Sequence, residues 1–585
     1  MSAERPGRDP DRPGGPARDG SGPADPSGTG RDIRPPGAVD TASDRSIDGS
    51  TDRGAIAEAP AVPVVPASLA SALAGWLLVL TMAMVVADRW IGGWPGIVAD
   101  ATVAVAVAIL VPAVPWGRRI FVALAGALIL AALALAPDPT GVIDAGLASG
   151  AFIAAFFTAQ ACLRSVAARS PAIADCGSYI AHQPPGRRYL ALTAGGQLFG
   201  IVLGYGALSL LGTLAETAAR EEANETRRRI RRRRMLLAIQ RGFVSTLPWS
   251  PLAFAVAITT ALLPGISWSA MVLPCLVSGV VLAGTGWALD SLLKPRVPGP
   301  PAVFEPDARS WRQALAPLVV LLALMGGAVA GVATLGAVSA PIAVMIVVPP
   351  LALAWIAVQT GGDPAAGGAP PRHAAGPLAG PLAAAAPVAA AVAAAAPPVA
   401  TGPPPPPAAA APAGPASWSD RRGAMAGWAI TYVTRELPAY RGELVLLVMA
   451  GVIGTIGGRL AAPAIAAGGL DLAVLPAWQV LMILLWAVPV AGQAGMNPIL
   501  AVSLLAPLLP SAESFGTTPV AVAVAITAGW SISGVTSPFT ATTLIIGSFG
   551  RVSATHVGLR WNALYTAITG VLLSAWTLAV HAMGI

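Results

Sequence analysis

Apolar runs of about 20 residues recur along the chain, separated by short polar segments that carry most of the arginines. A hydrocarbon core roughly 30 Å thick is crossed by a helix of about 20 apolar residues, so each run is long enough for one crossing. Backbone groups in lipid must be satisfied internally, and runs of this length favour helices over a barrel. The predicted spans are 66–87, 96–115, 120–136, 142–163, 236–263, 268–289, 314–335, 339–359, 443–465, 472–492, 494–511, 517–548 and 559–582.

This pattern predicts an all-α polytopic membrane protein with about 12–14 membrane segments. Composition agrees, because 55% of the residues are hydrophobic and only 11% are charged, too few to cover a soluble globule of this length. The net charge of +7 comes from arginines between the apolar runs, so it indicates membrane topology and not nucleic-acid binding. A single lysine, Lys294, and the abundance of Ala, Pro and Arg are typical of a GC-rich genome, and we expect a bacterial inner membrane.

Two segments contain no span. Residues 1–62 are rich in Pro, Gly, Asp and Arg and predict a disordered cytoplasmic tail. Residues 361–420 are almost entirely Ala, Pro and Gly and predict a disordered linker. The chain is thereby divided into an N-terminal membrane half, 63–360, and a C-terminal membrane half, 421–585.

Arginines orient the predicted spans. The tract at 227–234 holds seven arginines and is expected in the cytoplasm, as are Arg164, Arg169, Arg187 and Arg188. One crossing at 188–214 cannot place both groups inside. That segment is rich in glycine, so we infer a re-entrant helical hairpin, with two short spans as the alternative.

A short pattern occurs once in each half. Gly242-Phe243 is followed, after six residues, by Ser250-Pro251, and Gly529-Trp530 is followed at the same spacing by Ser537-Pro538. Ser250 and Ser537 lie 287 residues apart, each inside a long apolar run. Proline removes a helical hydrogen bond, so each run is expected to unwind there. Because the first runs outward from the arginine tract and the second ends before Arg551 and Arg560, the two copies form an inverted repeat; the alternative is two unrelated proline kinks.

Paired broken helices are the strongest sequence signal for the binding site of a secondary transporter. Helix N-termini attract anions, and hydroxyls with unwound carbonyls can hold Na⁺. A second candidate is the run Gly492 to Pro498, whose asparagine is alternatively only a helix cap. The predicted solute- or ion-binding residues are Ser250, Pro251, Asn497, Pro498, Thr536, Ser537, Pro538 and Thr540.

Arg459 is a basic residue inside an apolar run and is interpreted either as snorkelling to the surface or as a counter-charge for an anionic solute. Asp100, Asp144 and Asp290 fall near the ends of predicted spans, which favours coordination by hydroxyls and carbonyls over a proton-relay acid.

Two short motifs carry a resemblance to a known family: Gly495-Met496-Asn497-Pro498 and Thr536-Ser537-Pro538-Phe539-Thr540. In these motifs the chain resembles the ion transporter superfamily, which includes arsenite permeases and divalent-anion/sodium symporters. The resemblance covers roughly 140–290 and 440–582. It implies two inverted repeats, each with a re-entrant hairpin and a broken helix, and a peripheral interfacial helix at 423–440 whose Trp428, Tyr432 and Tyr440 face the lipid headgroups.

The expected function is therefore secondary active transport of a small anionic solute, with Na⁺ or H⁺ as the coupling ion and no other cofactor. Alternatives are a membrane enzyme of envelope or lipid metabolism, although no catalytic or metal motif is found, and a membrane scaffold. The expected partners are a small-molecule solute and the lipid bilayer, with a homodimer left open and nucleic acid excluded.

The odd number of crossings predicts a cytoplasmic N-terminus and a periplasmic C-terminus. Alkaline phosphatase fused after Ile585 should be active, and a cytoplasmic reporter at the same position silent. The opposite pattern would contradict the assigned topology.

Overall fold

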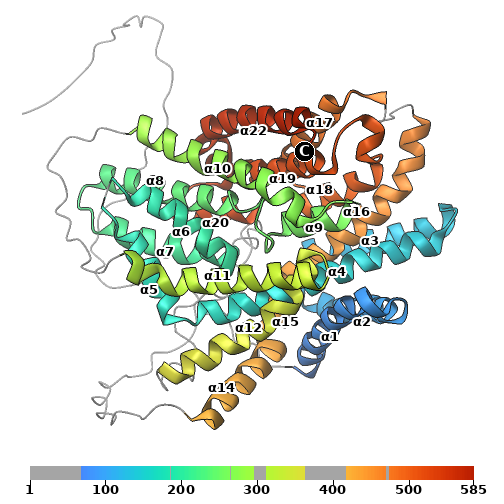
Figure 1. Cartoon of the computed structure of the whole chain (residues 1–585), viewed down its shortest axis with the longest axis horizontal. Helices are drawn as coiled ribbons and strands as arrows, with labels where there is room; N and C mark the ends of the chain where they lie inside the picture. The colour runs from blue at the N-terminus through green and yellow to red at the C-terminus, as the bar shows by residue number, and fades with distance from the viewer. Residues whose placement is uncertain (1–67, 185, 264, 295–310, 363–416, 469–473) are drawn as a thin grey trace, which may run out of the picture. The chain divides into compact units, whose positions relative to one another are not determined.

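The computed structural model describes residues 68–184, 186–263, 265–294, 311–362, 417–468 and 474–585 (Figure 1). The predicted tail, 1–62, and nearly all of the predicted linker, 361–420, lie outside these residues, so the division into two membrane halves stays a prediction. The described residues fall within one compact unit and contain helices and no strand.

Ten helices within this part of the chain are long and apolar enough to cross a membrane, which confirms an all-α polytopic membrane protein. Eight of them are α1 (Leu69–Ile91), α2 (Trp94–Leu110, extended to Ala113 by a 3₁₀ turn), α3 (Trp116–Leu135), α4 (Pro139–Ala168), α10 (Trp268–Leu292), α11 (Trp311–Leu335), α12 (Ala340–Gly362) and α16 (Arg441–Ala467). The other two are Pro519–Gly550, which is interrupted, and α22 (Ala563–Met583). The short α5 (Pro171–Ala181) follows α4.

The glycine-rich segment at 188–214 forms two helices joined by a tight turn, an arrangement common to the re-entrant hairpin and to the two short spans, so the choice between them stays a prediction. Helix α6 (Arg188–Leu203) ends at Gly204, and α7 (Gly206–Arg220) returns against it. Gly204 has φ +54°, a left-handed conformation that glycine adopts without steric cost.

Both predicted helix breaks are present. The first lies between α8 (Glu225–Val244) and α9 (Phe254–Leu262), and the second between α19 (Pro519–Thr536) and α20 (Ala541–Gly550). Each break contains its Ser-Pro pair, so the proline-based prediction is confirmed.

A second hairpin replaces two predicted crossings. Helix α17 (Ala477–Gln493) turns at residues 494–497 into α18 (Pro498–Leu505), which continues only as a 3₁₀ turn to Leu508. The prediction of 494–511 as a full span was wrong, because Gly495 at φ +89° reverses the chain and Pro507 and Pro510 prevent a longer helix. Exchanging two crossings for one hairpin leaves the odd parity unchanged.

The same order of elements occurs twice: a long helix, a hairpin, a broken helix and a second long helix. The first copy is α4, α6/α7, α8/α9 and α10, and the second is α16, α17/α18, α19/α20 and α22 (Figure 1). Counterparts pack on each other, α4 on α16 and α10 on α22. In addition, α7 contacts α20 while α18 contacts α9. This reciprocal exchange is the pattern that a pseudo-two-fold axis produces.

A residue that contacts its own counterpart must lie near such an axis. Gly534 is 287 positions after Leu247, and a Cβ atom at Gly534 would lie 3.5 Å from Leu247 Cδ1. The two broken helices therefore cross at this pair, three residues before each Ser-Pro.

The glycine of each repeated pattern is a packing residue. A side chain at Gly242 would overlap the carbonyl oxygen of Thr193 on α6, and one at Gly529 would overlap the carbonyl oxygen of Leu485 on α17. Each broken helix thus lies directly against the backbone of its own hairpin, as small residues at membrane helix interfaces allow.

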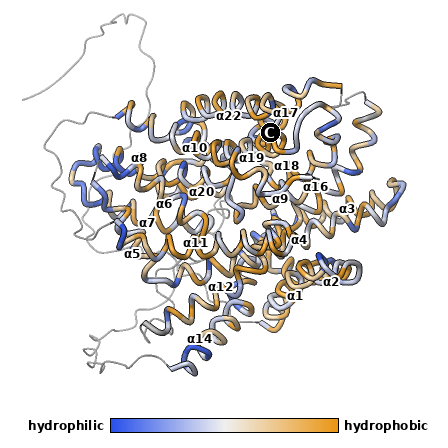
Figure 2. The backbone as a smooth tube through the Cα atoms, in the orientation of Figure 1, coloured by the Kyte–Doolittle hydropathy of each residue, from blue (hydrophilic) through white to orange (hydrophobic). Residues whose placement is uncertain are grey.

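The arginine tract at the start of α8 also makes structural ion pairs. Arg234 donates two hydrogen bonds to Asp290 of α10, both 2.7 Å long. Glu216 of α7 lies 3.5 Å from Arg232 and 3.6 Å from Arg551, the residue after α20. In Figure 2 the start of α8 is hydrophilic, whereas α11 and α22 are largely hydrophobic.

The predicted peripheral helix has a different role. Helix α14 (Trp418–Thr431) continues through a π-helical turn (Tyr432–Glu436) and α15 (Leu437–Ala439) and packs on α12 and α1. Trp428 donates to Ser165 Oγ at 3.0 Å and Tyr432 to the Thr158 carbonyl at 2.5 Å, and both rings are buried. Placing these two rings among lipid headgroups was wrong, because their polar atoms are satisfied by α4.

Replacing either packing glycine should separate a hairpin from its broken helix. Gly242→Ala and Gly529→Ala should each destabilise the protein by about 1–3 kcal/mol, the usual cost of overpacking. Thermal unfolding in detergent measures the effect. Gly326→Ala in α11, where a Cβ meets open space, is the matched control, and equal losses at all three positions would contradict the close approach.

Candidate solute site at the hairpins and helix breaks

The two Ser-Pro breaks share one local geometry. In each, the serine N–H donates to the carbonyl four residues earlier, at 3.0 Å for both Ser250 and Ser537. The serine Oγ accepts from the N–H two residues later, at 3.4 Å and 3.3 Å respectively. Its carbonyl accepts from the N–H three residues later, at 2.9 Å and 3.3 Å.

The helices also restart at equivalent positions. Helix α9 begins at Phe254 and α20 at Ala541, again 287 residues apart. Pro251 and Pro538 each follow the serine at the point where the chain leaves the helix. This agreement across one offset favours a true repeat over two unrelated proline kinks.

The second break supplies its own donors for carbonyls that lose a helical partner. Pro538 has no N–H, so the Gly534 carbonyl cannot make its helical bond and accepts instead from the Thr542 hydroxyl. The Val535 carbonyl accepts from Asn562 Nδ2 at 3.4 Å.

Three further threonine hydroxyls at the second break bond carbonyls in the same way. Thr540 and Thr543 donate to the Ser537 carbonyl at 2.9 Å and 2.6 Å, and Thr536 donates to the Ile532 carbonyl at 2.8 Å. In this conformation these hydroxyls therefore stabilise the break.

The turn of the second hairpin contacts the second break. Ser537 Oγ donates to the Gly492 carbonyl at 2.6 Å, and Gly495 lies beside the ring of Phe539. Asn497 is half-buried, and its Oδ1 accepts from the Ile499 N–H at 2.9 Å, which caps α18 in front of Pro498. The structure thus brings Asn497 and Ser537 to one hairpin–break junction and shows the capping role for the asparagine.

The first break obtains one donor from its own Trp249 and two from neighbouring helices. The Ser245 carbonyl accepts from Trp249 Nε1 and the Trp249 carbonyl from Trp268 Nε1, both at 2.9 Å. The Leu252 carbonyl accepts from the side chain of Gln160 on α4. Side chains therefore replace the missing helical bonds at both breaks, by different residues in each.

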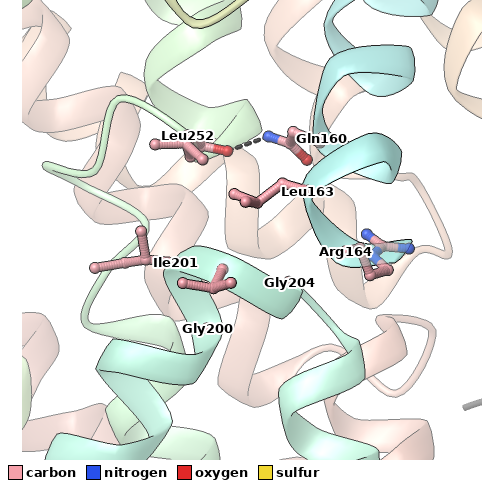
Figure 3. Close-up of a pocket in the computed structure, with 8 residues that line it drawn as sticks. Gln160, Leu163, Arg164, Gly200, Ile201, Gly204 and Leu252 are labelled. Atoms are coloured by element: carbon pink, nitrogen blue, oxygen red, sulfur yellow. Dashed lines mark hydrogen bonds between the residues drawn. The ribbon is translucent and has the colours of Figure 1, made fainter. Parts of the chain in front are cut away.

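A small cavity lies where the first hairpin meets the first break. Its volume is ≈ 20 Å³, room for about one water-sized group. It is lined from α4 by Gln160, Leu163 and Arg164, from the break by Leu252, and from the hairpin by Gly200, Ile201, Val202 and Gly204 (Figure 3). Ser250 belongs to this break, and Ser537 to the other.

Arg164 was missed as a site residue. It was assigned to a cytoplasmic loop, but α4 continues to Ala168 and the arginine is 7% exposed. The hydropathy pattern did not place Arg164 in a helix, because the predicted apolar span ended at residue 163, whereas the helix has 30 residues.

Arg241 is a second buried arginine missed at the sequence level. Its Nε donates to Asn562 Oδ1 at 3.1 Å, its Nη1 donates to Tyr189 Oη at 3.2 Å, and its guanidinium lies 4.4 Å from the ring centre of Tyr565. Asn562 Nδ2 donates to Gln240 Oε1 at 3.0 Å. Within the described residues Arg241 makes no ion pair, so its charge is held by neutral groups of both repeats. The sequence feature that could have identified Arg241 is a charged residue inside the apolar run 236–263.

Arg459 lies apart from the breaks. It is exposed, and its guanidinium donates at 3.2 Å to the carbonyl of Gly141 near the start of α4. Among the described contacts none joins it to either Ser-Pro pair, which favours the snorkelling interpretation.

Removing the hydroxyl that serves the Gly534 carbonyl should destabilise the second break. Thr542→Val keeps the shape but leaves a buried acceptor unpaired, at a cost of about 1–3 kcal/mol. Thr334→Val is the control, because Thr334 is exposed and its hydroxyl bonds a carbonyl within an uninterrupted helix. Thermal unfolding of both variants decides; a stable Thr542→Val would contradict the assigned role.

Several solved structures resemble this fold, among them the two described next, whereas no protein-family model and no curated protein matches the chain. The YdaH transporter of Alcanivorax borkumensis, described as having an unusual topology, is 14% identical over 79% of this chain and 98% of its own, with TM-score 0.46. MtrF of Neisseria gonorrhoeae, described with a class of antimetabolite efflux pumps, is 12% identical over 79% of this chain and 94% of its own, with TM-score 0.45. At this level of similarity, a functional assignment depends on the geometry of the chain itself.

Proposed function

We propose that the protein is a secondary active transporter of a small anionic solute, bound between the two hairpin turns and the two helix breaks. The carrying observation is the duplicated junction of a hairpin with a Ser-Pro break. Broken helices at corresponding positions of two repeats are how secondary transporters build a site within the membrane. The proposed binding residues are Ser250, Pro251, Asn497, Pro498, Thr536, Ser537, Pro538 and Thr540.

Charge near the junctions supports an anion. Arg241 lies one turn before the first break and is surrounded by amide and phenol groups, and Arg164 borders the cavity at that break. A buried positive charge is costly in a membrane protein and commonly marks a binding or ion pathway. The starts of α9 and α20 add the positive ends of two helix dipoles.

Sodium is the proposed coupling ion, since oxygen atoms dominate the second break. Ser533 Oγ is buried there without a hydrogen-bond partner among the described residues, close to Gly492 of the hairpin turn. Hydroxyl and carbonyl oxygens are suitable ligands for a hard cation.

We further propose the bacterial inner membrane as the location, with the first hairpin entering from the cytoplasmic side. The basic ends of α6 and α8 flank that hairpin, and Arg551 follows α20. Placing these arginines inside gives the two hairpins opposite membrane sides, as an inverted repeat requires.

Transport can be tested by solid-supported membrane electrophysiology of proteoliposomes exposed to a panel of organic anions, with and without a Na⁺ gradient. Ser250→Ala, Asn497→Ala and Ser537→Ala should each lower the current for an anion that the wild type carries, about tenfold for each 1.4 kcal/mol of lost binding. Ser209→Ala, a hydroxyl outside both junctions, should leave the current unchanged. Full currents in all three junction variants would exclude this site.

A further inference from the structure

Arg164 is a buried guanidinium in the first repeat. Its side chain is 9% exposed, and its charged carbon lies 6.0 Å from the ring centre of Phe157 and 5.3 Å from that of Tyr440. Aromatic rings hold a cation without consuming its directional N–H donors. Arg164 also hydrogen-bonds the Tyr440 side chain, so only part of its N–H donors remains available for another oxygen acceptor.

These donors are incompletely used. Arg164 Nε is buried and has no hydrogen-bond partner. The carboxylate of Glu443, on α16 of the second repeat, lies 3.8 Å from Nη1, too far for a direct hydrogen bond, and its Oε2 also lacks a partner. A buried guanidinium and a carboxylate that is 19% exposed are thus near each other without the paired geometry that normally offsets desolvation.

The small cavity also borders Arg164. A Cβ atom at Gly204 would lie 3.0 Å from Arg164 Nη2, so the glycine of the hairpin turn leaves room for the charged group. The cavity continues to Gln160 and to the Leu252 carbonyl in the break (Figure 3). It borders the hairpin, the break and a charged donor at one point.

We infer that Arg164 binds a carboxylate of the transported solute at the first hairpin–break junction, and that Glu443 is the internal carboxylate that holds this arginine when the site is empty. This inference rests on the proposed transport function and names the chemical class of its solute. A guanidinium offers two parallel N–H donors that match a planar carboxylate. The loose pair with Glu443 shows that an acceptor of this kind already approaches Arg164.

The charge balance around the pair favours exchange over permanent neutralisation. Arg118 of α3 and Tyr205 of the hairpin turn lie within electrostatic range of Glu443, and the ring of Tyr440 lies 5.3 Å from the charged carbon of Arg164. Two arginines against one carboxylate leave a net positive charge that an incoming carboxylate would offset. The solute and Glu443 then compete for the same guanidinium.

Binding to the purified, detergent-solubilised chain tests the inference without requiring transport. Acetate, benzoate and inorganic phosphate serve as probes, and the increase in unfolding temperature reports affinity because a ligand that binds only the folded state stabilises it. Glu443→Gln removes the competitor and should bind benzoate roughly tenfold more tightly than the wild type. Arg164→Gln should show no increase with either carboxylate.

Three further variants separate binding from folding defects. Arg164→Lys keeps the charge without the two parallel donors and should bind more weakly than wild type. The double variant R164Q/E443Q removes both charges together, so it should fold and still not bind. Glu436→Gln is the matched control, because Glu436 pairs with Arg169, the residue that follows α4, outside the cavity, and it should bind as the wild type does.

The outcomes are distinct. Benzoate binding that is strengthened by Glu443→Gln and abolished by Arg164→Gln supports the site, even if no current is found in proteoliposomes. Equal stabilisation of wild type, Arg164→Gln and the double variant would overturn it, as would no carboxylate effect on Glu443→Gln. Stabilisation by phosphate alone would overturn the carboxylate assignment.

Discussion

An interrupted helix inside a membrane leaves backbone carbonyls that water cannot satisfy, and this constraint governs the architecture. At the second break the Thr542 hydroxyl and the Asn562 amide bond the carbonyls of Gly534 and Val535. At the first break, Trp249 of the break itself and tryptophan and glutamine side chains from neighbouring helices do so. Each hairpin packs at glycine contact against its break, so the interruption, its donors and the hairpin form one structural unit. That unit occurs twice.

The two units are similar in backbone and different in chemistry. Counterpart helices pack reciprocally, and Leu247 meets Gly534 near the pseudo-two-fold axis. Arg241, however, has an alanine as its counterpart at position 528, and its bond to Asn562 joins the first broken helix to the segment before α22. A repeat supplies the pair of junctions, and the departures from symmetry give one of them a positive charge and the other a set of hydroxyls. The proposed anionic solute and the proposed coupling cation require unlike surroundings of this kind.

Features with a local cause were predictable from sequence. Proline placed both breaks within a few residues, and glycine in 188–214 indicated the first hairpin, because both effects act on the backbone itself. Features with a tertiary cause were not. Arg164 was assigned to a loop and Trp428 to the membrane interface. Hydropathy does not show that Arg164 is buried within α4, or that Trp428 is buried against α4 and donates to its Ser165. The span predicted at 494–511 also failed: the apolar residues of α18 pack on α16 and α9, and the helix does not cross the membrane.

The hairpins are also held by different forces. Helix α7 of the first hairpin is tied through Glu216 to Arg232 and Arg551, so charges fix its outer end against both repeats. The second hairpin makes its closest contacts through Gly492 and the Ser537 hydroxyl, and its turn residues Gln493 to Gly495 are exposed. The pair of Glu216 with Arg551, whose side chain is 69% exposed, weakens with salt, whereas packing and a buried hydrogen bond do not. Two hairpins of the same shape therefore respond to different influences, a difference that alternating access from two sides of a membrane can use.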